Sequence, residues 1–269
     1  MKLTYLGTAA AEGFPALFCR CRFCNEARSL GGKNIRTRSQ SLINDDLLID
    51  FPADTYWHFL QNGIEADKIA YLLITHAHPD HFYQSDLFMR TPPFAHEMRE
   101  PVLQVFCPKT VYEAFDKFPK NVTVTVLEAY QTVSVGPYRV TPLPARHMFG
   151  SEAFIYIIEG EKTILYTHDT GFPYEEVFSY IEENKLVFDM VSFDCTNVDI
   201  RISDEGTHMG FANIERAISR LSLMGAIHDS TVKYVNHFSH NGNPIHHLTE
   251  EAAKEYDCLV SYDGCQVIF

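Results

Sequence analysis

Short apolar runs separated by polar turns follow one another along the first part of the chain. Residues 69–75 (IAYLLIT) are apolar up to their last position, which predicts a strand covered on both faces. Gly160 and Glu161 separate two such runs and predict a tight hairpin. The other runs of this type predict strands over residues 2–6, 40–44, 46–51, 102–107, 122–127, 131–142, 153–159 and 162–167.

The last third of the chain follows a different pattern. Apolar residues recur with helical spacing over residues 173–184, 211–223 and 249–257, and Pro173 and Thr249 are expected at the first turn and the N-cap of their helices. Strands are predicted between these helices, over residues 190–193, 233–236 and 266–269. Two strand-rich halves, each supplied with helices, favour a four-layer α/β sandwich over a purely parallel sheet. Since no linker interrupts the sequence, we expect residues 1–269 to form a single domain.

The composition is that of a globular protein with a substantial core. The 269 residues are 46% apolar, and no stretch reaches 18 uncharged apolar residues, so no membrane-spanning helix is expected. The first residues are typical of a strand and a turn, not of a secretory leader, which favours a cytoplasmic protein. The net charge of −13 at pH 7 makes long nucleic acid an unfavourable partner and a small molecule a better one. The sequence leaves the oligomeric state open, a homodimer included.

The strongest chemical signal is Thr75-His-Ala-His-Pro-Asp-His81, directly after the predicted buried strand. Three imidazoles and a carboxylate within six residues are rare by chance, and loops at strand ends are where sites are built. His76 and His78 can project to one side of an extended segment, whereas Asp80 and His81 face another point. One motif can therefore serve two ions, and its donors suit Zn, Mn or Fe.

This motif resembles the metallo-β-lactamase superfamily, and the resemblance extends along the whole chain. It implies a metallo-β-lactamase-like αβ/βα four-layer sandwich with two catalytic divalent ions at the rim between its sheets. Three more residues match ligand positions of that superfamily, each just past a predicted strand: His147, Asp169 and His237. Asp50 matches the acidic residue that supports the metal loop by hydrogen bonds.

The resemblance also implies how the ions are shared and what they do. One ion would be bound by His76, His78 and His147, the other by Asp80, His81 and His237, with Asp169 between them. A hydroxide held by both ions would attack the substrate, because bound metals lower the pKa of water. Asp80 thereby counts as a catalytic residue as well as a ligand.

A cysteine cluster at Cys19, Cys21 and Cys24 carries a narrower resemblance. In a reducing compartment such clustering indicates a metal and not disulfides, and three thiolates at this spacing can bind one side of a tetrahedral zinc. The pattern LGTxxxxGxPxxxCxCxxC is similar to the PhnP-type phosphoribosyl cyclic phosphodiesterases. In that family a histidine three residues after the last catalytic ligand completes a structural zinc, and His240 has that place here. A zinc-binding loop is therefore expected at about residues 14–38.

The same family implies a role for His208. Its place before a predicted helix matches a histidine that donates a proton to the leaving group; the alternative is a solvent-exposed residue at the helix N-terminus. Asp194, next to Cys195, resembles an acidic–Cys pair of that family and is expected to play a supporting role.

Residues 82–101 and 199–207 do not match that family closely, so the substrate is not fixed by the resemblance. Phe82, Tyr83, Phe88 and Phe94, with Arg90, could contact a ring and a phosphate, or they could simply pack beside a solvated arginine.

The leading hypothesis is a dinuclear metal-dependent hydrolase that cleaves a small, cyclic phosphodiester. The alternatives are a tRNA-processing nuclease or a lactone or thioester hydrolase of the same superfamily. No basic arm that could hold tRNA is visible in this acidic chain, which disfavours the nuclease. A non-enzymatic, metal-stabilised module is less favoured still, because all seven catalytic ligand positions are intact.

Overall fold

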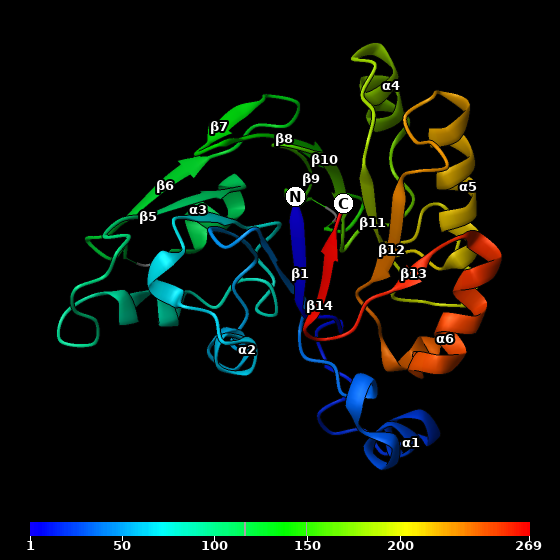
Figure 1. Ribbon diagram of the computed structural model, residues 1–269, viewed down its shortest axis with the longest axis horizontal. Helices are drawn as coiled ribbons and strands as arrows, with labels where there is room; N and C mark the ends of the chain where they lie inside the picture. The colour runs from blue at the N-terminus through cyan, green and yellow to red at the C-terminus, as the bar shows by residue number, and fades with distance from the viewer. Residues whose placement is uncertain (116, 149) are drawn as a thin grey trace.

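Two seven-stranded sheets pack face to face and carry helices on their outer sides (Figure 1). This arrangement comes from a computed structural model, which describes residues 1–115, 117–148 and 150–269. The order helix, sheet, sheet, helix confirms the predicted α/β sandwich. Among the described residues, no helix is both long and apolar enough to cross a membrane.

The first sheet has the strand order β14-β1-β2-β3-β4-β5-β6. Strand β1 pairs antiparallel with both of its neighbours, β14 and β2, whereas the last four strands, β3 to β6, are parallel to one another. Because parallel strands end at the same edge, the loops that follow β3 and β4 lie together. The strands are β1 (Lys2–Gly7), β2 (Gln40–Ile43), β3 (Leu47–Ile49), β4 (Tyr71–Leu73), β5 (Leu103–Cys107), β6 (Val122–Val126) and β14 (Cys265–Ile268). The helices of this half are α1 (Arg22–Leu30), α2 (Thr55–Asn62) and α3 (Lys109–Ala114), with 3-10 turns η1 (Gly32–Asn34), η2 (Ala66–Lys68) and η3 (Gln84–Arg90).

The second sheet has the strand order β13-β12-β11-β10-β9-β8-β7. Antiparallel pairing from β7 to β10 gives way to parallel pairing from β10 to β13. The strands are β7 (Val133–Val135), β8 (Tyr138–Pro144), β9 (Phe154–Glu159), β10 (Thr163–Thr167), β11 (Met190–Asp194), β12 (Val232–Asn236) and β13 (Leu259–Val260). Helices α4 (Glu175–Glu183), α5 (Phe211–Leu223) and α6 (His246–Ala253) accompany them, with 3-10 turns η4 (His240–Gly242) and η5 (Lys254–Tyr256).

Because side chains alternate between the two faces of each strand, the apolar residues form three layers: one between the sheets and one on the outer face of each sheet. In β10, Ile164 and Tyr166 pack between the two sheets, whereas Leu165 packs with the residues of the helices on the second sheet. In β1, Leu3 and Tyr5 face the second sheet and Leu6 faces the outer layer of the first. Successive side chains of a strand point to opposite faces, so strands covered on both faces are apolar at nearly every position.

Several predicted elements need correction. The run 131–142 is not one strand, because Gly136, with φ of 56°, turns the chain between β7 and β8. Thr249 is not an N-cap but lies inside α6, where its hydroxyl donates to the carbonyl of Ile245. Pro173 precedes α4, whose N-cap is Tyr174. The segment expected as a loop at 14–38 contains α1, whose N-cap is Cys21.

Candidate metal centre

The loops after β4, β8 and β10 bring four candidate ligands together. His76 Nε2 lies 2.9 Å from His78 Nδ1, and His147 Nε2 lies 3.0 Å from the same His78 atom. The carboxylate of Asp169 completes the group, with Oδ2 3.2 Å from His76 Nε2 and 3.6 Å from His147 Nε2. His76 and Asp169 are buried, and all four donor atoms lie within 4.8 Å of one another.

A second group of four shares Asp169. Oδ2 of Asp169 lies 2.8 Å from His81 Nε2, and Oδ1 lies 3.6 Å from His237 Nε2. Asp80 Oδ2 lies 3.3 Å from His81 Nε2. His237 comes from the loop after β12, so the second sheet supplies it, whereas Asp80 and His81 come from the first. All seven residues predicted from the sequence thus meet at one rim, in two groups that share Asp169.

The polar atoms at the centre of these groups fit divalent cations. Among the described residues, no well-aligned hydrogen bond satisfies the buried atoms His81 Nε2, His237 Nε2 and Asp169 Oδ1, since the contact of His81 Nε2 with Asp169 Oδ2 is close but poorly aligned. Buried polar atoms in this state are costly unless a ligand satisfies them. Two imidazole nitrogens bound at about 2.1 Å and about a right angle apart would lie about 3.0 Å from each other, as the nitrogens around His78 do. Three nitrogen or oxygen donors on either side of a shared carboxylate suit Zn, Mn or Fe.

Asp50 and Thr75 hold the metal loop from behind. Asp50 Oδ2 lies 2.7 Å from His81 Nδ1, and Asp50 Oδ1 accepts hydrogen bonds from the backbone N–H and the hydroxyl of Thr75. Nδ1 of His81 is therefore engaged by a carboxylate, which leaves Nε2 to face Asp169. Asp50, Asp169 and His237 adopt positive φ values of 65°, 55° and 65°, an uncommon backbone state for residues other than glycine that often accompanies functional sites.

Neighbouring charges and burial shift the pKa values of several candidate metal-binding residues. Burial by itself would raise the pKa of Asp169, but the imidazoles of His237 and His81 outweigh it and hold that pKa well below its usual range. Burial would lower the pKa of His81, but the carboxylates of Asp50 and Asp169 raise it well above the usual value. The pKa of His76 is lowered by burial and by the neighbouring His81. Asp169 is thus held as an anion, ready to bind cations.

His208 lies beside both groups. Its Nδ1 is 3.1 Å from Asp194 Oδ2 and 3.2 Å from Asp169 Oδ1, and its ring stacks on that of His237. Burial opposes the charged imidazole, but Asp194 prevails and raises the pKa of His208 to about 9. The side chain keeps 24% of its surface exposed, so it is not the fully solvated helix-end residue of the alternative interpretation. Asp194 also accepts hydrogen bonds from the backbone N–H groups of Thr196 and Met209.

Thr196 was not found from the sequence. Its hydroxyl lies 2.8 Å from His237 Nδ1, 3.2 Å from His208 Nδ1 and 3.1 Å from Asp194 Oδ2. It thereby joins the supporting carboxylate to two candidate site histidines. Threonine is common and no spacing marks it, so only its position next to Asp194 and Cys195 could have drawn attention to it.

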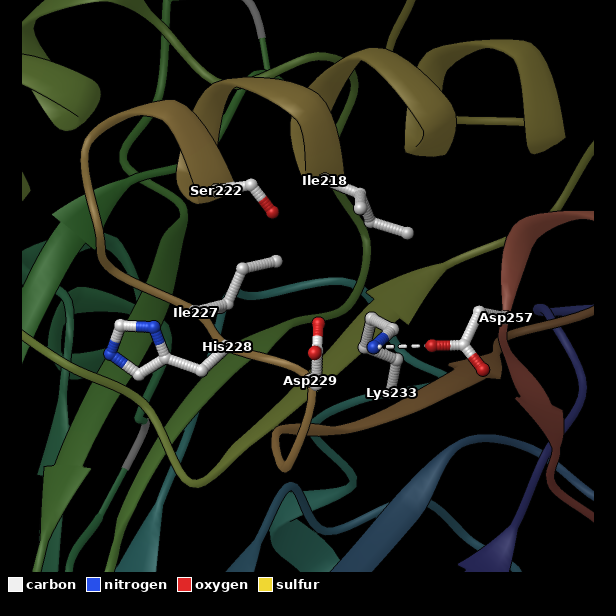
Figure 2. Close-up of a pocket in the computed structure, with 7 residues that line it drawn as sticks. All are labelled: Ile218, Ser222, Ile227, His228, Asp229, Lys233 and Asp257. Atoms are coloured by element: carbon white, nitrogen blue, oxygen red, sulfur yellow. Dashed lines mark ion pairs between the residues drawn. The ribbon is translucent and has the colours of Figure 1, made fainter.

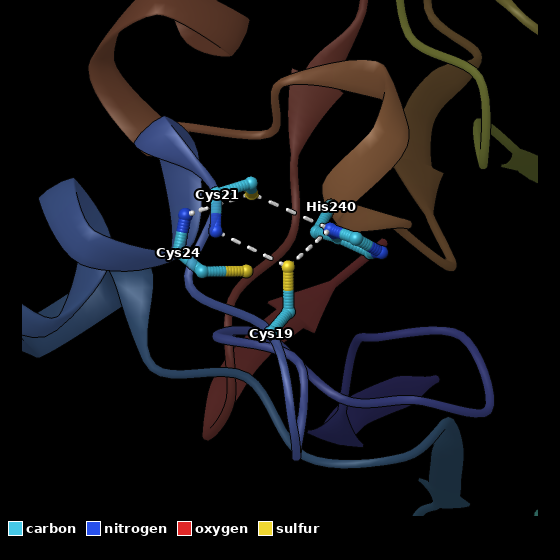
Figure 3. Close-up of side chains that lie close together, drawn as sticks. All are labelled: Cys19, Cys21, Cys24 and His240. Carbon is cyan, nitrogen blue, oxygen red and sulfur yellow. Dashed lines mark hydrogen bonds between the residues drawn. The ribbon is translucent and has the colours of Figure 1, made fainter.

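The cysteine cluster is a separate candidate metal site (Figure 3). Cys19, Cys21 and Cys24 face His240, with Nδ1 of His240 3.5 Å from Cys19 Sγ and 3.6 Å from Cys21 Sγ. A tetrahedral zinc with Zn–S of about 2.3 Å and Zn–N of about 2.05 Å would set these atoms about 3.6 Å apart. Burial would raise the pKa of Cys21, but the hydrogen bond with His240 prevails and lowers it to about 6, which favours the thiolate.

A different hollow lies at the opposite end of β12 from His237 (Figure 2). It has a volume of about 440 Å³ and is bordered by the end of α5, by His228 and by the ion pair between Lys233 and Asp257. None of the candidate metal ligands lines it. The candidate metal-binding residues thus lie at the rim between the sheets and not in this hollow.

Comparisons with known proteins agree with this geometry. Residues 50–238, more than half of the chain, match the family model described as the beta-lactamase superfamily domain. No curated protein sequence matches the chain closely enough to count as a relative.

Three solved structures illustrate the similarity of fold. A structure described as a diphosphatase from the PhnP family has 19% identity and a TM-score of 0.74, covering 99% of this chain and 96% of that one. Zn²⁺-bound PqqB from Methylobacterium extorquens has 18% identity and a TM-score of 0.74 over the full length of both chains. The metallo-beta-lactamase fold protein YhfI from Bacillus subtilis has 18% identity and a TM-score of 0.71, covering 99% of each chain. At these identities the similarity establishes the fold.

Proposed function

Because the chain belongs to the metallo-β-lactamase superfamily of metal-dependent hydrolases, we propose that it is a dinuclear phosphodiesterase that cleaves a small, cyclic phosphodiester. The observation that carries this proposal is the single carboxylate, Asp169, between two sets of three nitrogen or oxygen donors. Two divalent ions held there would supply an activated water and would offset negative charge on both the attacking and the leaving oxygen of a phosphoryl group.

Each candidate ligand has a defined task in this proposal. His76, His78 and His147 would hold one ion, and Asp80, His81 and His237 the other. Asp169 would bind both, since its carboxylate lies between the groups: Oδ2 is close to His76 of the first group and to His81 of the second, and Oδ1 faces His237. Asp50 fixes the ring of His81 through Nδ1, so that Nε2 is the nitrogen left to bind the metal ion.

His208 would move a proton. Asp194 holds its Nδ1, and a pKa of about 9 keeps the imidazole protonated at neutral pH. A protonated imidazole at the edge of the site can give its proton to a leaving alkoxide, because the pKa of the alcohol that forms is much higher than that of the imidazole. The leaving group would thus depart as an alcohol.

The choice of a small phosphoryl substrate rests on charge and on similarity. The net charge of −13 repels a long polyanion much more than a small one. One solved structure of this fold is described as a PhnP-family diphosphatase, which favours a diphosphate as the second candidate substrate.

We also propose a structural zinc at Cys19, Cys21, Cys24 and His240, based on the match of sulfur–nitrogen distances to a tetrahedral site. His240 lies three residues after His237. The ion would tie the N-terminal segment to the loop that carries a candidate catalytic ligand.

The test is a panel of hydrolysis rates together with metal analysis. The panel contains bis(p-nitrophenyl) phosphate, cyclic nucleotides, ribose cyclic phosphates, a dinucleoside diphosphate, lactones, a thioester and pre-tRNA. Cyclic phosphodiesters should be hydrolysed fastest, and Asp169→Ala should lose both activity and the catalytic ions because the shared carboxylate is gone. A wide preference for lactones, thioesters or pre-tRNA would replace the proposal by the corresponding alternative.

His208→Ala separates proton donation from binding. Substrates with a poor leaving group should lose more rate than activated nitrophenyl esters, because only the former need a proton. Equal losses on both classes would assign His208 to substrate binding.

A further inference from the structure

An apolar trough of about 970 Å³ lies on the outer face of the first sheet, between α2 and residues 83–98. Leu48, Leu72 and Leu103 of the buried outer layer form its floor. The volume is within the range of about 300–1,000 Å³ that is typical of small-molecule sites. None of the candidate metal ligands lines the trough, so it is a second site and not an extension of the metal centre.

The mouth of the trough is unusually apolar for a protein surface. Tyr56, Tyr83, Met89 and Phe94 line it and remain 70%, 40%, 46% and 64% exposed. Neighbouring large apolar side chains that stay exposed together mark interaction sites. Two of the aromatic residues singled out in the sequence, Tyr83 and Phe94, thus border this trough, whereas Phe82 packs against Phe115 in the core.

Arg90, a cation in the wall, has no anionic partner in the part of the chain that the structure describes. Arg90 lines the trough and donates from Nη2 to the carbonyl of Glu100, but its buried Nε has no hydrogen-bond partner. Within residues 1–115, 117–148 and 150–269, no carboxylate lies within ion-pair distance of Arg90. Asp67, which also lines the trough, is already bound by Arg99 through both of its oxygens. A half-buried guanidinium that no carboxylate of the described residues neutralises favours an anion.

We propose that the trough binds an amphipathic carboxylate of the fatty-acid type, with its head group on Arg90 and its aliphatic chain over the leucine floor. A chain of this kind covers the apolar lining and brings one negative charge to Arg90, which has no carboxylate partner among the described residues. The lining also holds Asp86, which would repel the head group, so the carboxylate is expected at Arg90 and not elsewhere in the trough.

The bound molecule would also contact the segment that carries the metal loop. Phe51 and Tyr83 line the trough, and they are joined by the hydrogen bond from the backbone N–H of Tyr83 to the carbonyl of Phe51. The N–H of Phe51 in turn donates to the carbonyl of His81, at 2.7 Å. A molecule bound in the trough would therefore contact Phe51, whose backbone is hydrogen-bonded directly to His81, a candidate metal-binding residue.

Titration calorimetry with three probes of equal chain length tests the proposal. Dodecanoate and dodecyltrimethylammonium are used below their critical micelle concentrations, and dodecanol below its solubility limit, on the metal-loaded protein. Dodecanoate should bind with one molecule per chain and at least about tenfold more tightly than the cation, because only the carboxylate can form a charge-assisted hydrogen bond with Arg90.

Two variants and a control locate the site. Arg90→Gln should remove the preference for dodecanoate over dodecanol while dodecanol still binds. Ala66→Trp fills the trough from its exposed edge and should weaken all three probes. Leu223→Trp, at a residue 88% exposed on α5, is the matched control and should bind as the wild type does. Circular dichroism checks that each variant is folded.

Four results would overturn the proposal. They are no saturable binding, equal affinity for the anionic and cationic probes, binding unchanged in Ala66→Trp, and a dimer in sedimentation analysis that Ala66→Trp dissociates. The last result would assign the trough to a second copy of the chain. None of these results depends on the reaction at the metal centre, so the two proposals fail independently.

Discussion

Lowering the pH from 7.5 to 5 should destabilise the fold through one buried imidazole, that of His58 in α2. His58 is 1% exposed, with Nδ1 2.6 Å from Gln40 Oε1 and Nε2 2.7 Å from Thr37 Oγ1. The amide nitrogen of Gln40 donates to the carbonyl of Asp50, which fixes Oε1 toward the ring. Since Oε1 can only accept, Nδ1 carries the proton of the neutral imidazole.

The magnitude follows from the shift in pKa. Burial lowers the pKa of His58 from 6.5 to about 4, so the folded protein keeps the ring neutral where the unfolded chain protonates it. The stability that the fold has with a neutral His58 is therefore complete above pH 6.5, the pKa of the unfolded state, and is lost progressively as the pH falls toward 4, the pKa of the folded state. One unit of pKa corresponds to about 1.4 kcal/mol, so about 2 kcal/mol is lost by pH 5 and about 3 kcal/mol by pH 4.

Urea unfolding at pH 7.5 and pH 5 measures this loss in the wild type, in His58→Gln and in His228→Gln. The wild type should lose about 2 kcal/mol more than His58→Gln between the two pH values. Groups that titrate in both proteins, the candidate metal ligands included, cancel in this difference. His228 is exposed, and its substitution should leave the loss as in the wild type. An equal loss in wild type and His58→Gln would refute the reasoning, and a larger loss in the variant would mean that a charged His58 stabilises the fold.

Three further substitutions have defined outcomes. Cys21→Ser should leave one zinc fewer per chain and lower the melting temperature while the catalytic ions are largely kept, as measured by elemental analysis and thermal unfolding; cysteines that react fully with a thiol reagent in the metal-loaded protein would contradict the site. Tyr156→Phe removes the hydroxyl that donates to the carbonyl of Ile74 at 2.6 Å and should cost about 1–3 kcal/mol in urea unfolding, because that buried carbonyl loses its partner. Gly171→Ala would place a Cβ 1.8 Å from the carbonyl oxygen of Gly206, so the two loops must separate and the free energy of unfolding should fall by about 1–3 kcal/mol or more. An unchanged melting temperature in Gly171→Ala would show that these loops are not in contact in solution.

The order and type of the main strands were predictable because their side chains alternate or are apolar throughout. The strand 153–159 was placed within one residue, and the helix 211–223 was placed at both ends, since its apolar residues repeat with the helical period. Helices α1, α2 and α3 were missed. They are short, and the exposed Tyr56, Trp57 and Leu60 of α2 blur the contrast between its faces.

The sequence by itself determined which residues could hold metal ions. The ligand types cluster at His76–His81 and Cys19–Cys24, and the remaining candidates each follow a strand, which depends only on local order in the chain. Asp169 was predicted as the shared carboxylate from resemblance alone.

Only the tertiary structure decided which of these side chains meet. Asp169 and His237 come from the second sheet and the metal loop from the first, so their convergence depends on how the sheets pack and not on any local pattern. The same holds for Thr196, which joins Asp194, His208 and His237, and for the position of Arg90 in the wall of the trough, beside its leucine floor. Distances between residues far apart in sequence are set by the burial of the whole apolar core, which is a property of the folded chain and cannot be assigned to any one segment.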